Sequence, residues 1–396
     1  MIIAPQPFYE ERGTPMNVRL MCTILGRAGF DVDLLVFPTG KDVEMVGVNI
    51  IRIPNVLGLK HIPIGFSWKK LFFDSLLPFW CLGLCVKNRY QVIHGVEEGG
   101  LIAVALGRFI GRCGTVFDMD SVMSDQFGPK GGKKKIQRII RWMEHWAMRR
   151  ASVVLTVCKA LSDAAYVTAP AESVVQIEDI PLEFAFPLTD TARAQSRFSV
   201  EQAATDLALE HKRILLYTGN LQPYQGIELL LESWQLFVQS IPDSSLYKLV
   251  IVGGPQQLAQ SYKKRLAHEE GQAEVCFVGP RPAVEMGAWM QLADALISPR
   301  SDGENTPLKI YTYMAAGKPI IATRMLTHTQ VLTDETAFLV APVAEEMAKV
   351  IQDCLVDTDK HNDKGAAALA LVEEQYSYEV FEQKLLHAYT LAQKRT

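Results

Sequence analysis

The feature that most constrains the fold of this sequence is a repeated alternation of short β-rich runs with segments of helical periodicity. The first half of the chain predicts strands at residues 2–4, 32–37, 48–53, 92–94, 115–118 and 153–157. The second half predicts strands at 213–218, 247–252, 275–278, 295–298, 319–322 and 337–340. Strands that alternate with helices pair in parallel and have helices on both faces. The sequence therefore predicts an α/β protein with two doubly wound, Rossmann-like domains that face each other across a cleft.

The length of 396 residues also favours two domains, because it exceeds what one ordinary core holds. Between residues 183 and 211 the alternation gives way to polar, Ala-rich sequence. We therefore expect an N-terminal domain at 1–185, a linker at 186–211 and a second domain at 212–375. The last segment, 376–396, has helical periodicity and is expected to cross back to the first domain as a helix.

The charge of the chain is slightly negative overall, with a net charge of −4 and a pI near 6.1, which argues against a nucleic-acid partner. Its distribution is uneven, because residues 130–150 contain eight Lys or Arg and one acid, Glu144. Trp142 and Trp146 interleave with these basic residues. A basic helix of this kind suits an anionic membrane surface, and an ordinary helix packed on the sheet is the alternative.

The cysteines indicate a reducing compartment, because the seven are scattered and form neither a C-x-x-C pair nor a zinc spacing. The first residues read as a strand and a polar turn, which is not the pattern of a signal peptide. The most apolar stretch, 71–86, contains Asp74 and Pro78 and is too short to span a bilayer. The expectation is a cytoplasmic protein with peripheral association at the inner face of a membrane.

The segment with the most chemical information is 297–323. Arg300 stands at the tip of a predicted strand, and Pro307 opens the helix that follows the polar loop. The free N–H groups and the dipole of a helix start favour an anion such as a diphosphate. Arg300 adds a fork of donors for phosphate oxygens, and Glu304 is placed to accept hydrogen bonds from sugar hydroxyls. An ordinary strand–loop–helix with a solvated loop is the alternative.

This segment resembles the signature of the GT-B-fold retaining glycosyltransferases of group 1, which include glycogen synthase, sucrose synthase and bacterial cell-envelope sugar transferases. The signature has a Glu, seven further residues, a second Glu and a small-Met-Ala-x-Gly-x-Pro tail. Glu304 matches the first Glu, and residues 313–319 match the tail. Thr312 occupies the second Glu position, which in the family contacts the ribose of the nucleotide. The resemblance covers nearly the whole chain.

In the second domain the resemblance implies a donor site with two substitutions. The family places an Arg and a Lys on the diphosphate after the first strand, where this chain has Asn220 and Gln225. Arg300 and Lys309 are the available replacements and are assigned the diphosphate. The resemblance also implies donor contacts from three glycines at strand ends, from one arginine near the base and from the loop before the helix. These residues are Gly219, Gly253, Gly279, Arg281, Asn305, Thr306 and Pro307.

In the first domain the resemblance implies contacts with donor and acceptor. Arg12, Gly13 and Thr14 resemble the family's glycine loop after the first strand, and a simple turn is the alternative. Asp120 stands where the family usually offers a His to the donor sugar. His94 and Glu97 end the preceding strand and are assigned to the acceptor, although a single His at a strand end is more often structural.

The implied activity is transfer of a sugar from a nucleotide-diphosphate sugar to a hydroxyl on a glycan or lipid-linked acceptor, with retention of configuration and without a cofactor or metal. Envelope polysaccharide synthesis is the expected role. Three alternatives stay open at this point. Asp118-x-Asp120 resembles the metal-binding pair of the other glycosyltransferase fold. An epimerase or phosphorylase relative shares the same domains. A catalytically degenerate member binds nucleotide sugars or a partner without turnover.

Overall fold

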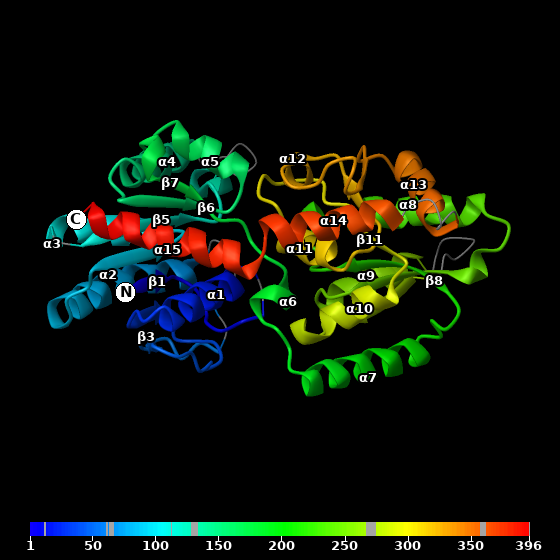
Figure 1. Cartoon of the computed structure of the whole chain (residues 1–396), viewed down its shortest axis with the longest axis horizontal. Helices are drawn as coiled ribbons and strands as arrows, with labels where there is room; N and C mark the ends of the chain where they lie inside the picture. The colour runs from blue at the N-terminus through cyan, green and yellow to red at the C-terminus, as the bar shows by residue number, and fades with distance from the viewer. Residues whose placement is uncertain are drawn as a thin grey trace. The chain divides into compact units, whose positions relative to one another are not determined.

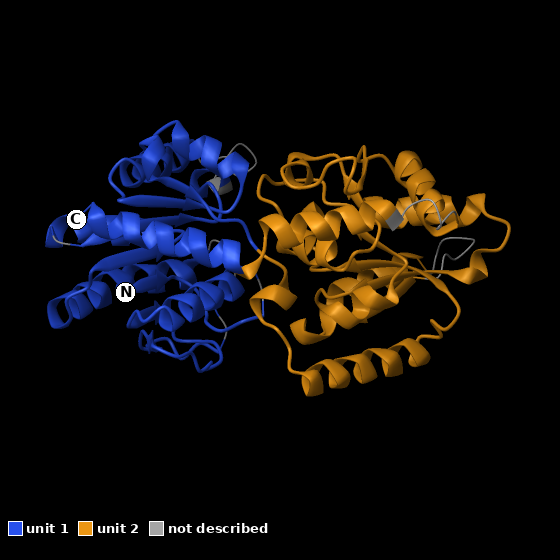
Figure 2. Ribbon diagram, in the orientation of Figure 1, with its two compact units in different colours: residues 1–179, 379–396 blue, residues 180–378 orange. Residues whose placement is uncertain are grey.

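The structure is a computed structural model that describes residues 1–11, 13–60, 62, 67–111, 113–127, 134–266, 275–356 and 362–395. Two compact units make up the chain (Figure 2). Unit 1 comprises Met1–Asp179 and Glu379–Thr396, and unit 2 comprises Ile180–Tyr378. Each unit is built around one parallel sheet with helices on both faces (Figure 1).

The sheet of unit 1 has the strand order β3-β2-β1-β4-β5-β6-β7, with all neighbours parallel. Its strands are β1 (Ile2–Ala4), β2 (Val32–Val36), β3 (Val48–Arg52), β4 (Val92–Val96), β5 (Gly114–Met119), β6 (Val153–Thr156) and β7 (Val174–Gln176). Its helices are α1 (Gly13–Arg27), α2 (Trp68–Lys87), α3 (Gly99–Ile110), the short 3-10 helix η1 (Met123–Phe127), α4 (Lys134–Met148), α5 (Lys159–Tyr166), η3 (Ala171–Ser173) and α15 (Tyr378–Lys394).

Strand order decides which helices share a face of this sheet. The chain moves from β1 to β2 and β3 in one direction and from β4 to β5, β6 and β7 in the other. Because parallel crossovers are right-handed, α1 covers one face, and α2, α3, α4 and α5 cover the other. Two apolar clusters lie beneath the second group: one packs α2 and α3 on the sheet, and the next packs α3 and α4.

The sheet of unit 2 has the strand order β10-β9-β8-β11-β12-β13, again with all neighbours parallel. Its strands are β8 (Arg213–Thr218), β9 (Tyr247–Val252), β10 (Val275–Gly279), β11 (Ala295–Ser298), β12 (Ile320–Thr323) and β13 (Phe338–Val340). Its helices are α6 (Leu182–Ala185), α7 (Asp190–Asp206), η4 (Pro223–Gln225), α8 (Ile227–Ser240), η5 (Ser244–Leu246), α9 (Gln256–Leu266), η6 (Ala283–Glu285), α10 (Met286–Leu292), α11 (Leu308–Ala315), α12 (Leu326–Thr329), α13 (Ala344–Val356) and α14 (Asn362–Gln375).

The strands of both units form because their sequences are apolar on both faces, as buried parallel strands require. Every residue of β4, β5 and β11 is buried. An apolar cluster of unit 2 joins β8, β9 and β11 to α8 and α13, with Trp234 and Phe237 fully enclosed. The predicted fold class, two Rossmann-like α/β domains, is confirmed. Among the described helices, none combines the length and apolar character needed to cross a bilayer.

The domain limits in the structure differ from the expected ones. The division falls between Asp179 and Ile180, and the expected linker, 186–211, contains α7, which is counted with unit 2. Its Ser199 hydroxyl donates to Glu285 at 3.0 Å and accepts from Arg281 at 2.9 Å. The polar sequence of this segment therefore reflects a surface helix attached by polar contacts. Helix α15 is counted with unit 1 apart from its first residue.

Candidate functional site

The strand order of unit 2 places a topological switch point between β8 and β11, where the chain turns in opposite directions from two adjacent strands. Ligands of doubly wound sheets bind at this position, outside the carboxyl ends of the strands. Gly219 and Asn220 follow β8, and Pro299 and Arg300 follow β11. The two segments touch, because a Cβ on Gly226 would lie 1.9 Å from the Pro299 carbonyl oxygen. Sequence and topology thus lead to the same edge of the sheet.

Three glycines form the rim of this edge. The Gly219 N–H donates to the Val252 carbonyl at 2.9 Å, and the Gly253 N–H donates to the Gly279 carbonyl at 2.8 Å. A Cβ on Gly253 would meet the Gly219 oxygen at 2.3 Å, and all three glycines have positive φ. Positive φ disfavours a side chain at all three positions, and at Gly253 a side chain would also overlap the main chain of Gly219. The three strand tips therefore lack side chains, and donor binding by Gly219, Gly253 and Gly279 stays a prediction.

Arg300 is buried at this edge. Its Nε donates to the Asp302 carbonyl at 2.8 Å, and one terminal nitrogen donates to Asn305 Oδ1 at 3.0 Å. The guanidinium also lies over the Tyr224 ring, 5.3 Å from its centroid. Burial lowers the pKa of Arg300 from its usual value. The two oxygens that accept from it are neutral, so an anionic ligand would be a stronger partner than either.

Lys309, in the first turn of α11, is the second cation of the site. Its ammonium donates to Gln225 Oε1 at 3.1 Å and lies 4.1 Å from the centroid of the Tyr217 ring. Burial lowers the pKa of Lys309 well below the usual range, and the nearby Arg300 lowers it further. The ammonium is also close to the strand tip, since a Cβ on Gly219 would lie 3.5 Å from it. Two desolvated cations next to each other favour an anion between them.

The start of α11 lies beside these cations. Pro307 is its N-cap residue and provides no side-chain cap. The preceding Thr306 is buried, and its hydroxyl has no hydrogen-bond partner among the described residues. A buried hydroxyl without a partner is uncommon in folded proteins and indicates a site for a ligand or water. Glu304 is exposed at the rim of the same loop, where its carbonyl accepts from Gln330 at 2.7 Å.

Four further residues that the sequence assigned to the donor are already engaged within unit 2. Asn220 is exposed, and its side chain bonds Tyr224 and the Gln222 N–H. Gln225 is buried and accepts from Lys309. The Thr312 oxygen is buried and lies 3.5 Å from the Leu182 nitrogen. Arg281 forms an ion pair with Glu285 at 2.7 Å and bonds Ser199, so its side chain fixes α7 rather than extending toward the strand tips.

A buried histidine that the sequence analysis did not identify lies behind Arg300. His328 Nε2 is 2.9 Å from Ser298 Oγ at the end of β11, and Nδ1 is 2.8 Å from the Thr323 carbonyl. The Thr323 hydroxyl in turn donates to the Arg300 carbonyl. Burial lowers the pKa of His328 to about 4, so the ring is neutral at physiological pH. His328 therefore fixes the backbone that carries Arg300.

The switch point of unit 1 lies between β1 and β4, and its edge is acidic. Asp120 follows β5, close to Asp118, Glu97 and Asp179, and its carboxylate accepts from the Thr14 hydroxyl. Burial raises the pKa of Asp120 well above its usual value, and the neighbouring carboxylates raise it further. Burial and the same crowding raise the pKa of Asp179 to about 7. The predicted residues Thr14, Glu97 and Asp120 are therefore brought together.

The placement of the remaining predicted residues in unit 1 varies. Gly13 begins α1, and nothing lies within 4 Å of a Cβ built on it. Arg12 lies outside the described residues. His94 is completely buried: Nδ1 is 2.9 Å from the Tyr389 hydroxyl of α15, and Nε2 is 3.3 Å from Asp118. His94 therefore joins α15 to β5 within unit 1 and does not reach the surface, which favours the structural role over contact with an acceptor.

Several residues of the site were missed by the sequence analysis. Tyr217 and Tyr224 support the two cations, and Tyr313 accepts from the Thr218 N–H at 2.8 Å. Tyr217 and Tyr224 flank the turn after β8, and each stands two residues before a glycine, Gly219 or Gly226. In the basic segment 130–150, residues 130–133 lie outside the described residues, and α4 begins at Lys134. Its acid, Glu144, is buried and accepts from the Met123 and Ser124 N–H groups.

Two parallel Rossmann-like units, with glycine strand tips and a helix start at the second switch point, define a GT-B type of protein. Two family models match this chain: Glycosyl transferases group 1 over residues 212–357, and Glycosyl transferase 4-like domain over residues 12–177. Residues 212–357 therefore match the group 1 glycosyl transferases, and residues 12–177 match the glycosyl transferase 4-like domains.

Among curated relatives, the chain is 26% identical to the D-inositol 3-phosphate glycosyltransferase of Jonesia denitrificans over 64% of its own length and 60% of the relative. It is 29% identical to the lipopolysaccharide 1,2-N-acetylglucosaminetransferase of Salmonella typhimurium, over 44% of this chain and 47% of the relative. The matches thus span less than two thirds of these relatives.

Solved structures share the fold over the whole chain. The sucrose-phosphate synthase of Thermosynechococcus elongatus superimposes with a TM-score of 0.76 at 19% identity, covering 100% of both chains. The Anabaena protein HepE, solved in complex with UDP-glucose, superimposes with a TM-score of 0.69 at 15% identity, covering 98% of this chain and 99% of the other.

Proposed function

We propose that the protein transfers a glycosyl group from a nucleotide-diphosphate sugar to a hydroxyl of a glycan or lipid-linked acceptor, with retention of anomeric configuration. The observation that carries the proposal is the pair of desolvated cations, Arg300 and Lys309, beside the start of α11 and the glycine strand tips. This arrangement suits a diphosphate. The names of the relatives and the UDP-glucose complex of HepE support the same substrate class.

In the proposed reaction, the acceptor oxygen bonds the anomeric carbon on the face from which the diphosphate leaves. The bond between the anomeric carbon and the phosphate oxygen breaks, and the acceptor proton passes to that oxygen. Negative charge then develops on the leaving diphosphate, where Arg300, Lys309 and the N–H groups of α11 stabilise it. Thr306 supplies a further donor to the same group. Glu304 and Asp120 are assigned to the donor sugar, and Glu97 to the acceptor side.

Asp120 has a second role in this proposal. The sugar ring acquires positive charge as the diphosphate departs, and nearby negative charge stabilises it. Burial and the negative charge of Asp118 disfavour ionisation of Asp120 and Asp179. Developing positive charge relieves part of that repulsion, so the acidic edge of unit 1 is suited to a transition state of this kind.

We propose that turnover is independent of a metal, because cationic side chains occupy the place that a divalent ion would serve. Asp118, one member of the Asp-x-Asp pair, is buried and bonded to His94. EDTA is therefore expected to leave the rate unchanged. Loss of activity with EDTA and its recovery with manganese would favour the metal alternative.

The test of the proposed function is a donor panel. Purified protein is incubated with UDP-, GDP- and ADP-sugars, and release of the nucleoside diphosphate is followed with and without candidate acceptors. Two results together would support retaining transfer: release of the nucleoside diphosphate from donors of one nucleotide class, and an NMR spectrum of the product that shows the anomeric configuration of the donor. Binding of a donor without turnover in every combination would instead support the degenerate alternative, which the substitutions at Asn220, Gln225 and Thr312 motivate.

A further inference from the structure

Helix α2 of unit 1 has two apolar sides, and only one of them packs on the sheet. Its inner side buries Phe73, Leu77 and Cys81 in an apolar cluster with β1, β2 and β4. Its outer side exposes a second row of large apolar residues along the whole helix, which are Trp68, Phe72, Phe79, Leu82 and Val86. Phe79 is 75% exposed and Val86 is 82% exposed. The spacing of four, seven, three and four residues keeps this row on one side of the helix.

The neighbouring helices continue this outer surface. Helices α2, α3 and α4 cover the same face of the sheet, where α3 packs beside each of the other two. Phe109 is exposed at the end of α3, and α4 exposes Ile136, Ile139 and Trp142, the last of them by 67%. In Figure 1, α2 and α4 lie at the outer margin of unit 1. Exposed apolar area of this extent marks an interaction surface.

The charges on the same helices have one sign at the surface. The exposed ionised residues of α2, α3 and α4 are Lys69, Lys87, Arg108, Lys134, Lys135, Arg138 and Arg141. The acids of these helices are Asp74, which is half-buried and pairs with Lys70 at 3.4 Å, and Glu144, which is buried and bonds main-chain N–H groups. A basic surface has formed on a chain whose net charge is −4.

We infer that the outer faces of α2, α3 and α4 form a docking surface for an anionic lipid bilayer, in which α2 lies in the plane of the interface. The exposed aromatic and aliphatic side chains would enter the boundary between headgroups and acyl chains, and the lysines and arginines would contact anionic headgroups. Helix α2 is about 30 Å long at the rise of an α-helix, so the whole row contacts one leaflet. The inference does not depend on the donor chemistry proposed above.

Sedimentation with vesicles tests this inference on the full-length chain. Vesicles of phosphatidylcholine alone are compared with vesicles that also contain phosphatidylglycerol. We expect binding to the anionic vesicles that weakens as salt is raised. Phe79→Asp and Val86→Asp should each reduce the affinity by roughly tenfold or more, and Lys135→Glu or Arg138→Glu by roughly fivefold.

Matched controls come from unit 2. Phe198 on α7 is 67% exposed, and Lys349 on α13 is also exposed, so Phe198→Asp and Lys349→Glu make the same changes elsewhere. Both should bind vesicles as the unaltered protein does. Thermal melting confirms that each variant is folded, and donor hydrolysis in solution reports separately on the proposed function, so failure of either proposal is distinguishable.

Tryptophan fluorescence gives a second measurement. Trp68, Trp80 and Trp142 are exposed on these helices, whereas Trp234 and Trp289 are buried in unit 2. Insertion predicts a blue shift and quenching by brominated lipids, both reduced by Phe79→Asp. Equal binding to both vesicle types by all variants would overturn the inference. A lipid-free dimer that Phe79→Asp dissociates, without vesicle binding, would overturn it too and assign α2 to a second copy of the chain.

Discussion

The two sheet edges at the switch points of this molecule share a topology and differ in charge. At the edge of unit 2, Arg300 and Lys309 lie beside glycine strand tips and a helix start. At the edge of unit 1, burial and the negative charge of Asp118 raise the pKa of both Asp120 and Asp179. Buried cations without strong partners favour an anionic ligand, and buried acids favour hydroxyl groups or positive charge. The comparison teaches that the same strand topology carries opposite charge at the switch points of the two units.

The largest expected effect comes from removing a cation from the edge of unit 2. Arg300→Ala should lower turnover by roughly a hundredfold to a thousandfold, because a charge-assisted donor to the leaving group is lost. Arg300→Lys should recover part of the rate, since the charge returns without the fork of donors. Steady-state kinetics on folded variants checks this. Near-normal turnover in Arg300→Ala would mean that the diphosphate binds elsewhere, and the cationic edge of unit 2 would then have no role in binding it.

The second prediction is that Asp179, at the acidic edge of unit 1, destabilises the folded protein when it is ionised. The folded state holds the Asp179 proton up to a pKa of about 7, above the ordinary 3.8. The contribution of Asp179 to the free energy of unfolding is therefore most favourable below pH 3.8, and it is lost as the pH rises to about 7. Asp179→Asn should stabilise the protein above this range by roughly 1 to 2 kcal/mol.

Urea denaturation on both sides of that pKa measures the effect. The variant should gain stability at the higher pH and show a flatter dependence on pH than the unaltered protein. Asp163, exposed on α5 and paired with Lys159 at 2.9 Å, provides the control, because Asp163→Asn should leave the pH dependence unchanged. If Asp179→Asn and Asp163→Asn showed the same dependence of stability on pH, the acids at the edge of unit 1 would not be the source of that dependence.

A smaller effect is expected from the aromatic support of the cationic edge. Tyr224 lies under Arg300, so Tyr224→Leu should reduce kcat/KM by roughly two- to fivefold through loss of the cation–π contact. Tyr224→Phe retains the ring and should stay close to the unaltered enzyme, although it loses the bond from Asn220. Equal losses in both variants would assign the role of Tyr224 to its hydroxyl instead.

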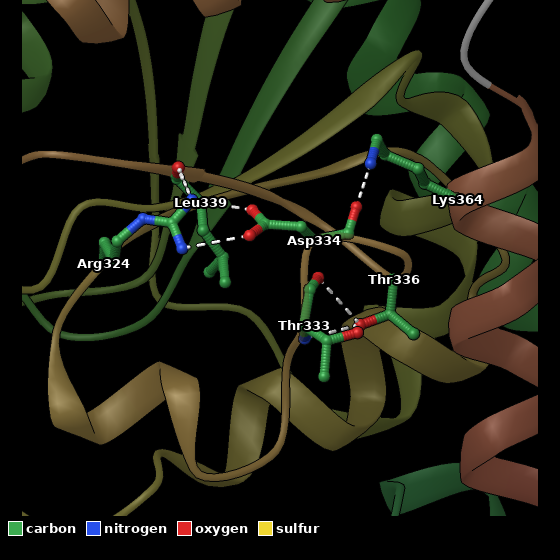
Figure 3. A network of polar contacts seen from close by, with 6 residues as sticks. All are labelled: Arg324, Thr333, Asp334, Thr336, Leu339 and Lys364. Atoms are coloured by element: carbon green, nitrogen blue, oxygen red, sulfur yellow. Dashed lines mark hydrogen bonds and ion pairs between the residues drawn. The ribbon is translucent and has the colours of Figure 1, made fainter.

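The smallest effect is expected at an arginine of unit 2 that already has an acidic partner. Arg324 forms two bonds to Asp334, at 2.7 and 3.1 Å, and a third to the Leu339 carbonyl, while Lys364 bonds the Asp334 carbonyl (Figure 3). Both side chains of the ion pair are half exposed or more. Arg324→Ala should therefore change the stability little, because solvent screens an exposed ion pair, and should leave turnover unchanged. A loss of turnover comparable to that of Arg300→Ala would remove the distinction between the two arginines.

The sequence by itself determined the fold class and most of the strands, because the spacing of apolar residues that marks a buried strand or helix can be read within each segment. It also located the glycines at the ends of β8, β9 and β10 and the helix start after Pro307, since each follows from residues adjacent in the chain. It did not find strand β7, whose three residues carry too little periodicity to be recognised alone. It predicted a linker with one helix before residue 212, where the structure has helix α7 and counts it with unit 2.

Only the tertiary structure decided which of the polar residues are available to a ligand. His94 is bonded by Tyr389 from the far end of the chain, and Arg281 is held by Glu285 and Ser199. The acidic cluster is assembled from β5 and the segment after β7. Helix α2 has apolar residues on two sides, and only packing decides that one row is buried and the other exposed. Partners such as these depend on strand order and packing, so no local pattern in the sequence contains them.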